Sequence, residues 1–317
     1  MEGYQITSDE ISVIQKKFKI VGRHDELEKA IAAVKTSKHI LIEGSVGIGK
    51  TMLAEAIAKY SNRNIYRIDG DERYTEQKLV GWFDPPIVMT KGYCPEAFIP
   101  GPLVEAMRDG SFLFVNELNR MPEGTQNVLL PAMDEKHIVV PKIGKVKAKD
   151  GFIIIATQNP EEYIGTSRLS EALKDRFVWI KLGHQSEEEE IEIVRKETKS
   201  LDLNLIQIAV AITRKTRECT ELRRGASVRG AIDIVALTPA LSRHHNKNGL
   251  DAQERAKIIE NASIMALTPK VESREASGEK LEEILKKIVD EVLTNKTLEK
   301  SSTGDEAEES KERTQNF

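Results

Sequence analysis

An eight-residue segment of the chain has the residue types and spacing of a phosphate-binding loop. Residues 44–51 read GSVGIGKT, which fits the pattern G-x-x-x-x-G-K-[ST]. Glycines let backbone N–H groups close around phosphate oxygens, and a helix that starts at the loop adds a favourable dipole. Lys50 would contact the β- and γ-phosphates of ATP, and the Thr51 hydroxyl would ligate Mg²⁺. The predicted nucleotide-binding residues of the loop are Gly44, Ser45, Val46, Gly47, Ile48, Gly49, Lys50 and Thr51.

The flanking sequence supports this interpretation of the loop. An apolar run, HILIE, precedes it, and a helical run, MLAEAIAKY, follows it. This strand–loop–helix order is the context in which the pattern binds phosphate. A plain glycine turn is the alternative, and it does not explain the lysine and threonine that open the helix.

A second polar site follows another apolar run. Residues 112–115 are apolar, and Asn116 and Glu117 come directly after them, as in a Walker B motif. Glu117 would polarise the water that attacks ATP, although an ordinary surface carboxylate is the alternative. The preceding position usually carries an Asp that helps to hold Mg²⁺, whereas here it is Asn116. An amide brings no charge, so we expect weaker Mg²⁺ affinity and slow turnover, and we expect Asn116→Asp to raise the rate.

Short apolar runs alternate with helical runs in the first part of the chain. Each run is nearly continuous in apolar residues and is bounded by turn or helix signals, which is typical of parallel strands buried on both faces. The sequence therefore predicts an α/β fold with a parallel five-stranded sheet. The predicted strands are 39–42, 64–68, 112–115, 152–156 and 178–180, and predicted helices include 25–34 and 51–60.

Two insertions and a change of composition define the predicted domains. Residues 81–102 and 137–150 are each expected to form a surface hairpin. After residue 183 no strand is predicted; Ser186 and Glu189 form a capping box, and an apolar stripe between Leu281 and Val292 has helical spacing. We expect an N-terminal segment (1–18), an α/β nucleotide-binding domain (19–183), an all-α lid domain (184–297) and a disordered acidic tail (298–317).

The overall composition excludes several classes of protein. The net charge of −4 over 317 residues argues against a nucleic-acid coat protein or a membrane-surface protein. No apolar run approaches membrane-spanning length, and no signal peptide is visible. The two cysteines, Cys94 and Cys219, are far apart and in no metal-ligand pattern, which fits a reduced compartment. We therefore expect a cytoplasmic protein without membrane insertion.

Several motifs in order resemble those of the MoxR-type AAA+ ATPases, and the resemblance runs from Ile20 to Thr268. Besides the phosphate-binding loop, the segments that carry it are IVGR (20–23), IPGPL (99–103), NELNRMPEGTQNVLLPAMDE (116–135), IIATQNP (154–160), LSEALKDRF (169–177) and GASVRG (225–230).

The resemblance implies roles for five further residues. Asn159 matches sensor 1, which contacts the attacking water or the γ-phosphate, and Arg176 matches the arginine finger that reaches the ATP of a neighbouring subunit. Arg229 matches sensor 2 on the lid, and Val21 with Gly22 matches the segment that lines the adenine pocket. The alternatives are a turn residue for Asn159 and a helix-end dipole partner for Arg176. Arg229 lies near a helix start, where a cation is unfavourable, so an anionic partner is plausible.

The resemblance also implies partners. It implies a homo-oligomeric ring, expected to be a hexamer, that remodels or matures a protein client, often with a von Willebrand A-domain protein. A nucleic-acid-stimulated motor that uses the lysines at 142–149 is one alternative. A nucleotide-gated assembly switch, motivated by Asn116, is the other. Arg120 is a candidate interface residue, and Arg168 stands where a proline is expected.

Overall fold

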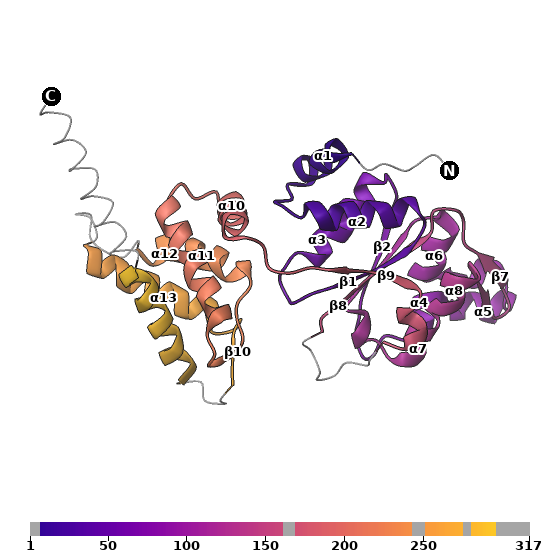
Figure 1. The fold of residues 1–317 in the computed structure, drawn as a ribbon. Coiled ribbons are helices and arrows are strands. Elements are labelled where there is room, and N and C mark those ends of the chain that lie inside the picture. Colours follow the sequence, from indigo (N-terminus) through magenta and orange to yellow (C-terminus); the bar gives the residue numbers. More distant parts are fainter. Residues whose placement is uncertain (1–6, 161–168, 243–250, 275–279, 296–317) are drawn as a thin grey trace, which may run out of the picture. The chain divides into compact units, whose positions relative to one another are not determined.

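The chain forms two compact units, Met1–Gly183 and His184–Phe317, in a computed structural model (Figure 1). The structure describes residues 7–160, 169–242, 251–274 and 280–295. Arg168 and the predicted disordered tail, 298–317, lie outside these ranges. Within them, no helix combines the length and the apolar character needed to span a membrane.

The first unit contains a parallel five-stranded sheet, as predicted. Its strands occur in the spatial order β2-β5-β8-β1-β9, so that the strand before the phosphate-binding loop lies between β8 and β9. Every predicted strand is present, and each bound differs by at most two residues. The strands are β1 (His39–Glu43), β2 (Ile65–Asp69), β5 (Phe112–Asn116), β8 (Ile153–Gln158) and β9 (Phe177–Lys181).

The three central strands, β5, β8 and β1, are buried on both faces, which explains why they read as continuous apolar runs. Side chains alternate between faces along a strand. Ile40 and Ile42 therefore pack on one face and Leu41 on the other, each against a different helical layer. The helices on the face of Ile40 are α1 (Ser8–Phe18), α2 (His24–Lys35) and α3 (Lys50–Tyr60). Those on the face of Leu41 include α4 (Glu76–Val80), α6 (Pro102–Asp109) and α8 (Leu129–Asp134).

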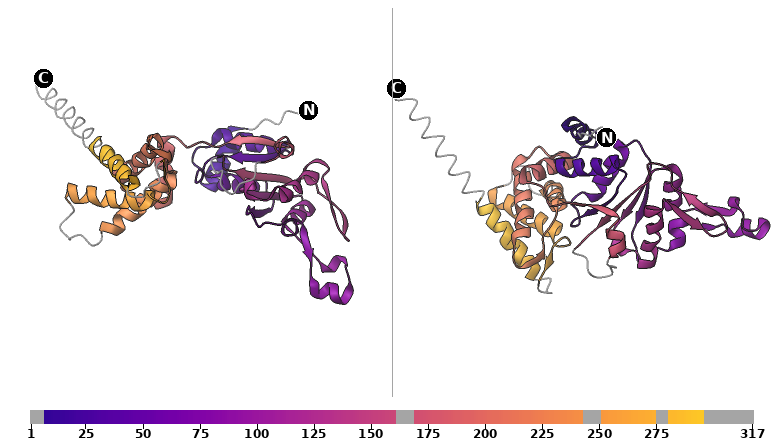
Figure 2. Two further views of the ribbon diagram at one scale, coloured as in Figure 1. Left: turned by 90° about the horizontal axis from the view of Figure 1, so that it is seen from below. Right: turned by 45° about the vertical axis from the view of Figure 1, so that its right-hand side comes forward.

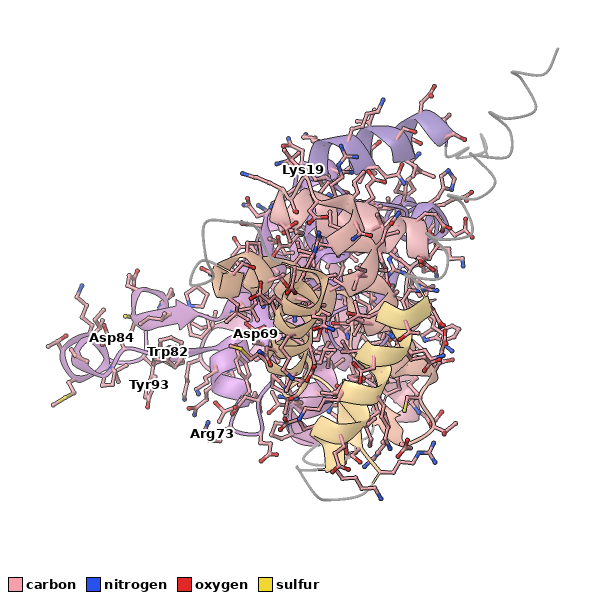
Figure 3. All side chains as sticks on the ribbon, turned by 90° about the vertical axis from the view of Figure 1, so that its left-hand side faces the viewer. Lys19, Asp69, Arg73, Trp82, Asp84 and Tyr93 are labelled. Carbon is pink, nitrogen blue, oxygen red and sulfur yellow. The ribbon has the colours of Figure 1, made fainter. Side chains whose placement is uncertain are left out.

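The first insertion is a projecting arm with a helical tip (Figures 2 and 3). Two short strands pair antiparallel at its base, and Phe83 contacts the rings of Tyr93 and Phe98 at centroid distances of 5.0 and 5.4 Å. The predicted hairpin is therefore confirmed, with a helical tip in addition. Its elements are β3 (Gly81–Phe83), α5 (Pro85–Lys91), η1 (Pro95–Ala97) and β4 (Phe98–Pro100).

The second insertion is a plain antiparallel hairpin, as predicted. It consists of β6 (His137–Val140) and β7 (Gly144–Lys147). Lys142 and Gly144 adopt positive φ angles of 66° and 95° in the turn, which glycine accepts without strain.

A helical segment leads to the second insertion. α7 (Glu123–Asn127) and α8 are separated at Val128. Pro131 therefore lies in the first turn of α8, where its missing N–H costs no helical hydrogen bond.

The second unit is helical around its own buried core. The capping box of Ser186 and Glu189 at the start of its first helix is confirmed. A two-stranded antiparallel ladder, β10 (Leu222–Arg224) with β11 (Glu272–Ser273), is present in addition, and its two or three residues per strand are too short for a sequence pattern. The helices are α10 (Glu187–Thr198), α11 (Leu203–Glu218), α12 (Val228–Ser242), α13 (Ala252–Leu267) and a helix over 280–295 that carries the predicted apolar stripe.

The histidine that begins β1 makes the stability of the first unit depend on pH. Burial lowers the pKa of His39 to about 4, and its Nδ1 accepts a hydrogen bond from the Ile154 N–H at 2.9 Å. The unfolded chain takes up this proton near pH 6.5 and the folded chain does not. Stability should therefore fall between pH 6.5 and 4, by at most about 1.4 kcal/mol per pH unit from this group.

Urea unfolding of the wild type and of His39→Gln at pH 7.0 and 5.0 measures this dependence. Other groups titrate in both proteins, so the relevant quantity is the difference between their pH slopes. We expect the variant to lose less stability on acidification. Equal slopes would show that His39 is not held neutral by the fold.

Candidate active site

The phosphate-binding loop has the geometry that its sequence predicts. α3 begins at Lys50, and Gly47 and Gly49 before it adopt positive φ angles of 82° and 95°. The Lys50 ammonium is buried and donates hydrogen bonds to the carbonyls of Gly44, at 2.5 Å, and Ser45, at 2.8 Å. These contacts place the ammonium inside the loop. A bound phosphate would replace the carbonyl oxygens as the partner of the ammonium there.

The start of the loop leaves no room for a side chain. A Cβ atom on Gly44 would lie 2.6 Å from the Leu182 carbonyl oxygen and 2.3 Å from the Ile48 side chain. The loop therefore lies directly against the residues that follow β9. A cradle of this shape, with a lysine inside it and Thr51 on the first turn of the helix, fits the triphosphate of ATP and its Mg²⁺.

Arg23 fixes the loop from outside, a role that sequence reasoning missed. Its buried guanidinium donates to the Ile48 carbonyl at 2.9 Å, to the Gly183 carbonyl at 2.8 Å and to Glu26 at 2.9 Å. It thereby joins the start of α2, the phosphate-binding loop and the last residue of the first unit. The motif IVGR pointed to this segment, but the partners of Arg23 are 25 and 160 residues away.

The predicted adenine-pocket residues precede Arg23 directly. Val21 is buried, and Gly22 has a φ of 63° and accepts a hydrogen bond from Gln15 at 2.6 Å. The contact between Arg23 and the loop brings this segment next to the phosphate-binding residues, and its role in binding adenine stays a prediction.

Asn116 links the ends of three strands. Its amide nitrogen donates to Asp69 Oδ1, at the end of β2, at 3.0 Å, and its Oδ1 accepts from the buried Thr157 hydroxyl, in β8, at 3.0 Å. The same hydroxyl accepts the Glu117 N–H at 2.8 Å. Asp69 and Thr157 were not identified from the sequence, because strand adjacency cannot be read from spacing alone.

The Asn116 contacts orient its amide and place a charge beside it. One lone pair of Oδ1 remains for a Mg²⁺-bound water. The Arg67 guanidinium, together with the Asn116 amide, lowers the pKa of Asp69, so a negative charge lies one strand away from the usual Walker B position. A carboxylate in place of Asn116 would face this charge at hydrogen-bonding distance.

Glu117 is held by an ion pair within its own turn. It adopts a left-handed conformation, with φ 56° and ψ 52°, before the short helix η2 (Leu118–Arg120). Its Oε2 lies 3.1 Å from the Arg120 Nε. This ion pair orients the Glu117 carboxylate and neutralises part of its charge, so Arg120 acts on Glu117 within the same chain.

Asn159 lies at the same edge of the sheet as Glu117. It follows β8 directly, is 3% exposed, and comes after Gln158, which donates to Glu43 at the end of β1. Because β1, β8 and β5 are adjacent and parallel, the phosphate-binding loop, Asn159 and Glu117 all follow their carboxyl ends. The sheet thus brings together three of the predicted elements.

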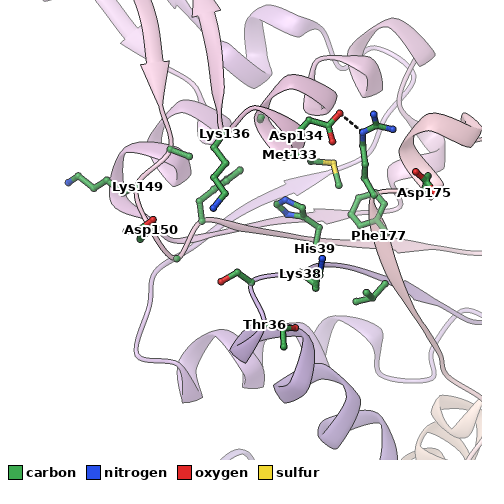
Figure 4. A pocket seen from close by; sticks show the side chains of 17 residues that line it. Thr36, Lys38, His39, Met133, Asp134, Lys136, Lys149, Asp150, Asp175 and Phe177 are labelled. Atoms are coloured by element: carbon green, nitrogen blue, oxygen red, sulfur yellow. Dashed lines mark hydrogen bonds and ion pairs between the residues drawn. The ribbon is translucent and has the colours of Figure 1, made fainter. Parts of the chain in front are cut away.

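Arg176 lies at the opposite side of the sheet, beside the amino ends of the strands. It follows α9 (Glu171–Lys174) and precedes β9, whose first residue, Phe177, pairs with His39 at the amino end of β1. Arg176 lines a cavity of about 700 Å³ together with His39 and Asp134, and the latter two are labelled in Figure 4. The fold therefore separates Arg176 from the phosphate-binding loop of its own chain.

Arg229 belongs to the second unit. It is exposed on the first turn of α12, and its role as sensor 2 stays a prediction.

The contact between Asn116 and Asp69 changes what is expected of Asn116→Asp. Alone, this substitution places two carboxylates together, which opposes the gain from a charged Mg²⁺ partner. Combined with Asp69→Asn, it restores one carboxylate and one amide. In a double-mutant cycle of Mg²⁺-dependent ATP binding, we expect a favourable coupling of about 1 kcal/mol or more.

Titration of a fluorescent ATP analogue, with and without Mg²⁺, measures this coupling without requiring turnover. Asp71→Asn, which changes a nearby carboxylate outside the contact, is the matched control. Additive effects of the two substitutions would show that the residues act independently.

The chain is similar to bacterial proteins and to solved structures along most of its length. Residues 39–177 match the AAA domain family, dynein-related subfamily. An uncharacterized protein of Staphylococcus epidermidis is 30% identical over 220 residues, which cover 68% of this chain and 83% of that protein. The uncharacterized protein YeaC of Bacillus subtilis is 27% identical over 256 residues, 72% of this chain and 77% of that protein.

Two solved structures share the fold. NtrX from Brucella abortus, in complex with ADP, is 21% identical and has a TM-score of 0.51, with coverage of 74% of this chain and 53% of that one. A variant of RuvB from Thermotoga maritima is 18% identical and has a TM-score of 0.50, with coverage of 76% and 70%. Together with the geometry of the site, these matches show that the chain belongs to the AAA domain proteins of the dynein-related subfamily, whose fold implies ATP binding and hydrolysis.

Proposed function

We propose that the chain is a Mg²⁺-dependent ATPase of the MoxR type that works as a ring of identical copies and remodels or matures a protein client. The observation that carries the proposal is the separation of Arg176 from its own phosphate-binding loop by the length of the sheet. A guanidinium stabilises the negative charge that develops during phosphoryl transfer only when it lies beside the phosphates. Arg176 meets this condition when it reaches the ATP of a second copy.

A head-to-tail arrangement of copies follows from this geometry. The face that contains Arg176 would contact the face that contains the phosphate-binding loop of the next copy, and such heterologous contacts close into rings. The strand that follows Arg176 supports an interface there, because β9 is an edge strand and its Trp179 is 57% exposed. A ring of six copies is the family expectation.

The residues at the carboxyl edge of the sheet fit the chemistry of slow ATP hydrolysis. Lys50 would bind the β- and γ-phosphates, Thr51 and Asn116 would hold Mg²⁺ directly or through water, and Glu117 with Asn159 would orient the attacking water. When bound, Mg²⁺ neutralises charge on the phosphates. Asn116 contributes no charge, and the ion pair with Arg120 neutralises part of the charge on Glu117. Both features favour slow turnover.

The two insertions offer surfaces for a client. The first exposes Trp82, Met89 and Tyr93, with exposed fractions of 46%, 87% and 61%. Figure 3 shows Trp82 and Tyr93 on an arm away from the sheet. Exposed apolar side chains gathered on a projection favour contact with another protein. The second carries the exposed Lys145 and Lys147. A von Willebrand A-domain protein is the partner expected from the family resemblance.

Activity should depend on assembly. We expect phosphate release per subunit, with Mg²⁺-ATP, to rise with protein concentration in parallel with particle mass. Arg176→Ala should lower it by roughly a thousandfold, because the transition-state charge loses its partner. Lys174→Ala, which removes an exposed cation two residues away, is the matched control and should leave activity near the wild-type level.

Other outcomes identify the alternatives. Assembly driven by ATP with almost no phosphate release would favour a nucleotide-gated switch. Stimulation by DNA or RNA that falls steeply with salt would favour a nucleic-acid motor. Activity that is independent of concentration in a monomeric protein would contradict the shared site.

A further inference from the structure

The side chain of Arg176 is held by two groups of its own chain. Its Nε lies 2.6 Å from Asp134 Oδ2, and its Nη1 donates to the Ala172 carbonyl at 2.5 Å. Figure 4 draws this ion pair as a dashed line from Asp134. Ala172 belongs to the same helix end as Arg176, whereas Asp134 is 42 residues away in sequence. The ion pair with Asp134 therefore joins Arg176 to another part of the domain.

That other part is the base of the second hairpin. Asp134 is the last residue of α8, and only Glu135 and Lys136 separate it from β6. Lys136 has a φ of 52°, and its carbonyl accepts the Ala148 N–H at 2.7 Å, which closes the base of the hairpin. A change in the position of Asp134 is thus passed to β6 across two residues.

The hairpin is anchored well enough to respond as a unit. Ile138, Val140 and Val146 are buried in the same core cluster as α6 and α8. Beyond β7, the Lys149 N–H donates to the Met107 carbonyl at 2.8 Å. Packed elements move between discrete arrangements and do not deform continuously.

The contact between Arg176 and Asp134 can be exchanged without disturbing the core. The side chains of Arg176 and Asp134 are 30% and 44% exposed, and partly exposed ion pairs stabilise only weakly. The cavity beside the pair lies between Arg176 and the hairpin base, and both line it. A phosphate group presents more charge than a carboxylate and binds a guanidinium in the same two-pronged geometry, so it competes well for Arg176.

We propose that Asp134 is a positioning residue that links Arg176 to the hairpin formed by residues 137–147. Asp134 orients the Arg176 guanidinium as long as no phosphate lies within reach of Arg176. When the nucleotide of the next copy binds Arg176, the ion pair between Arg176 and Asp134 breaks. The end of α8 is then released, and the conformation of the hairpin changes. The nucleotide state of one copy is thereby reported at the hairpin of its neighbour. This inference rests on the proposed function, since it requires a second copy of the chain.

Hydrogen exchange of the hairpin amides tests the link in the full-length protein. The exchange of residues 137–147 is measured by mass spectrometry with Mg²⁺ and either ADP or a non-hydrolysable ATP analogue, under conditions of assembly. In the wild type, we expect the two nucleotides to give exchange rates that differ severalfold. In Asp134→Asn, the rates should become equal, while nucleotide binding and particle mass are retained.

Two further variants separate the link from a merely structural role. Asp134→Glu keeps the carboxylate and should restore the nucleotide-dependent difference. Asp175→Asn changes a neighbouring carboxylate on the same cavity and should leave the difference intact. A destabilised α8 would alter the hairpin with both nucleotides, and the glutamate variant would not restore it.

The outcomes also distinguish this inference from the proposed function. If the wild type assembles and Arg176→Ala abolishes hydrolysis, but Asp134→Asn keeps a wild-type response at the hairpin, the link is wrong and the ring ATPase stands. If no nucleotide causes assembly, both fail. A wild-type hairpin that exchanges at one rate with either nucleotide also overturns the link.

Discussion

The parallel direction of the strands in the central sheet is the constraint on which the arrangement of the site depends. In a parallel sheet all carboxyl ends lie at one edge, so the phosphate-binding loop, Glu117 and Asn159 meet there although more than a hundred residues separate the first from the last. The same strand direction places Arg176, which precedes a strand, at the amino ends of the strands. Under the proposed function, a chain folded in this way divides its catalytic groups between two faces, and a second copy of the chain would bring them together.

Contacts within the chain hold the charged groups of this proposed site. Lys50 donates to carbonyls of its own loop, Glu117 pairs with Arg120, and Arg176 pairs with Asp134. Two of these are partly exposed ion pairs, which are weak enough to be exchanged for phosphate or water. The fold thus orients each charge and leaves it available, and under the proposed function the exchange of partners would couple hydrolysis to movement.

The sequence predicted features that depend on local pattern and missed those that depend on distant neighbours. The five strands, the loop at Gly44 to Thr51 and the capping box of Ser186 follow from short-range spacing, and the structure contains them. The contacts of Asn116 with Asp69 and Thr157, and of Arg23 with Gly183, join residues 41 to 160 positions apart. No periodicity in the sequence encodes such pairs, because they can be inferred only when the order of the strands is known. The ladder of β10 and β11 was missed for a different reason, since two or three residues are too few to show a pattern.

Complementation between two inactive variants tests the divided site most directly. Glu117→Gln lacks the group that is proposed to polarise water, and Arg176→Ala lacks the guanidinium. In a mixed ring, an Arg176→Ala subunit keeps its Glu117, and a Glu117→Gln neighbour supplies Arg176, so the site between these two subunits is complete. Random mixing makes about a quarter of the interfaces complete. The account predicts that each variant alone releases almost no phosphate and that an equimolar mixture recovers about that fraction of wild-type activity. If Arg176 acted within its own subunit, every subunit would lack one group, and a mixture as inactive as its components would contradict the account.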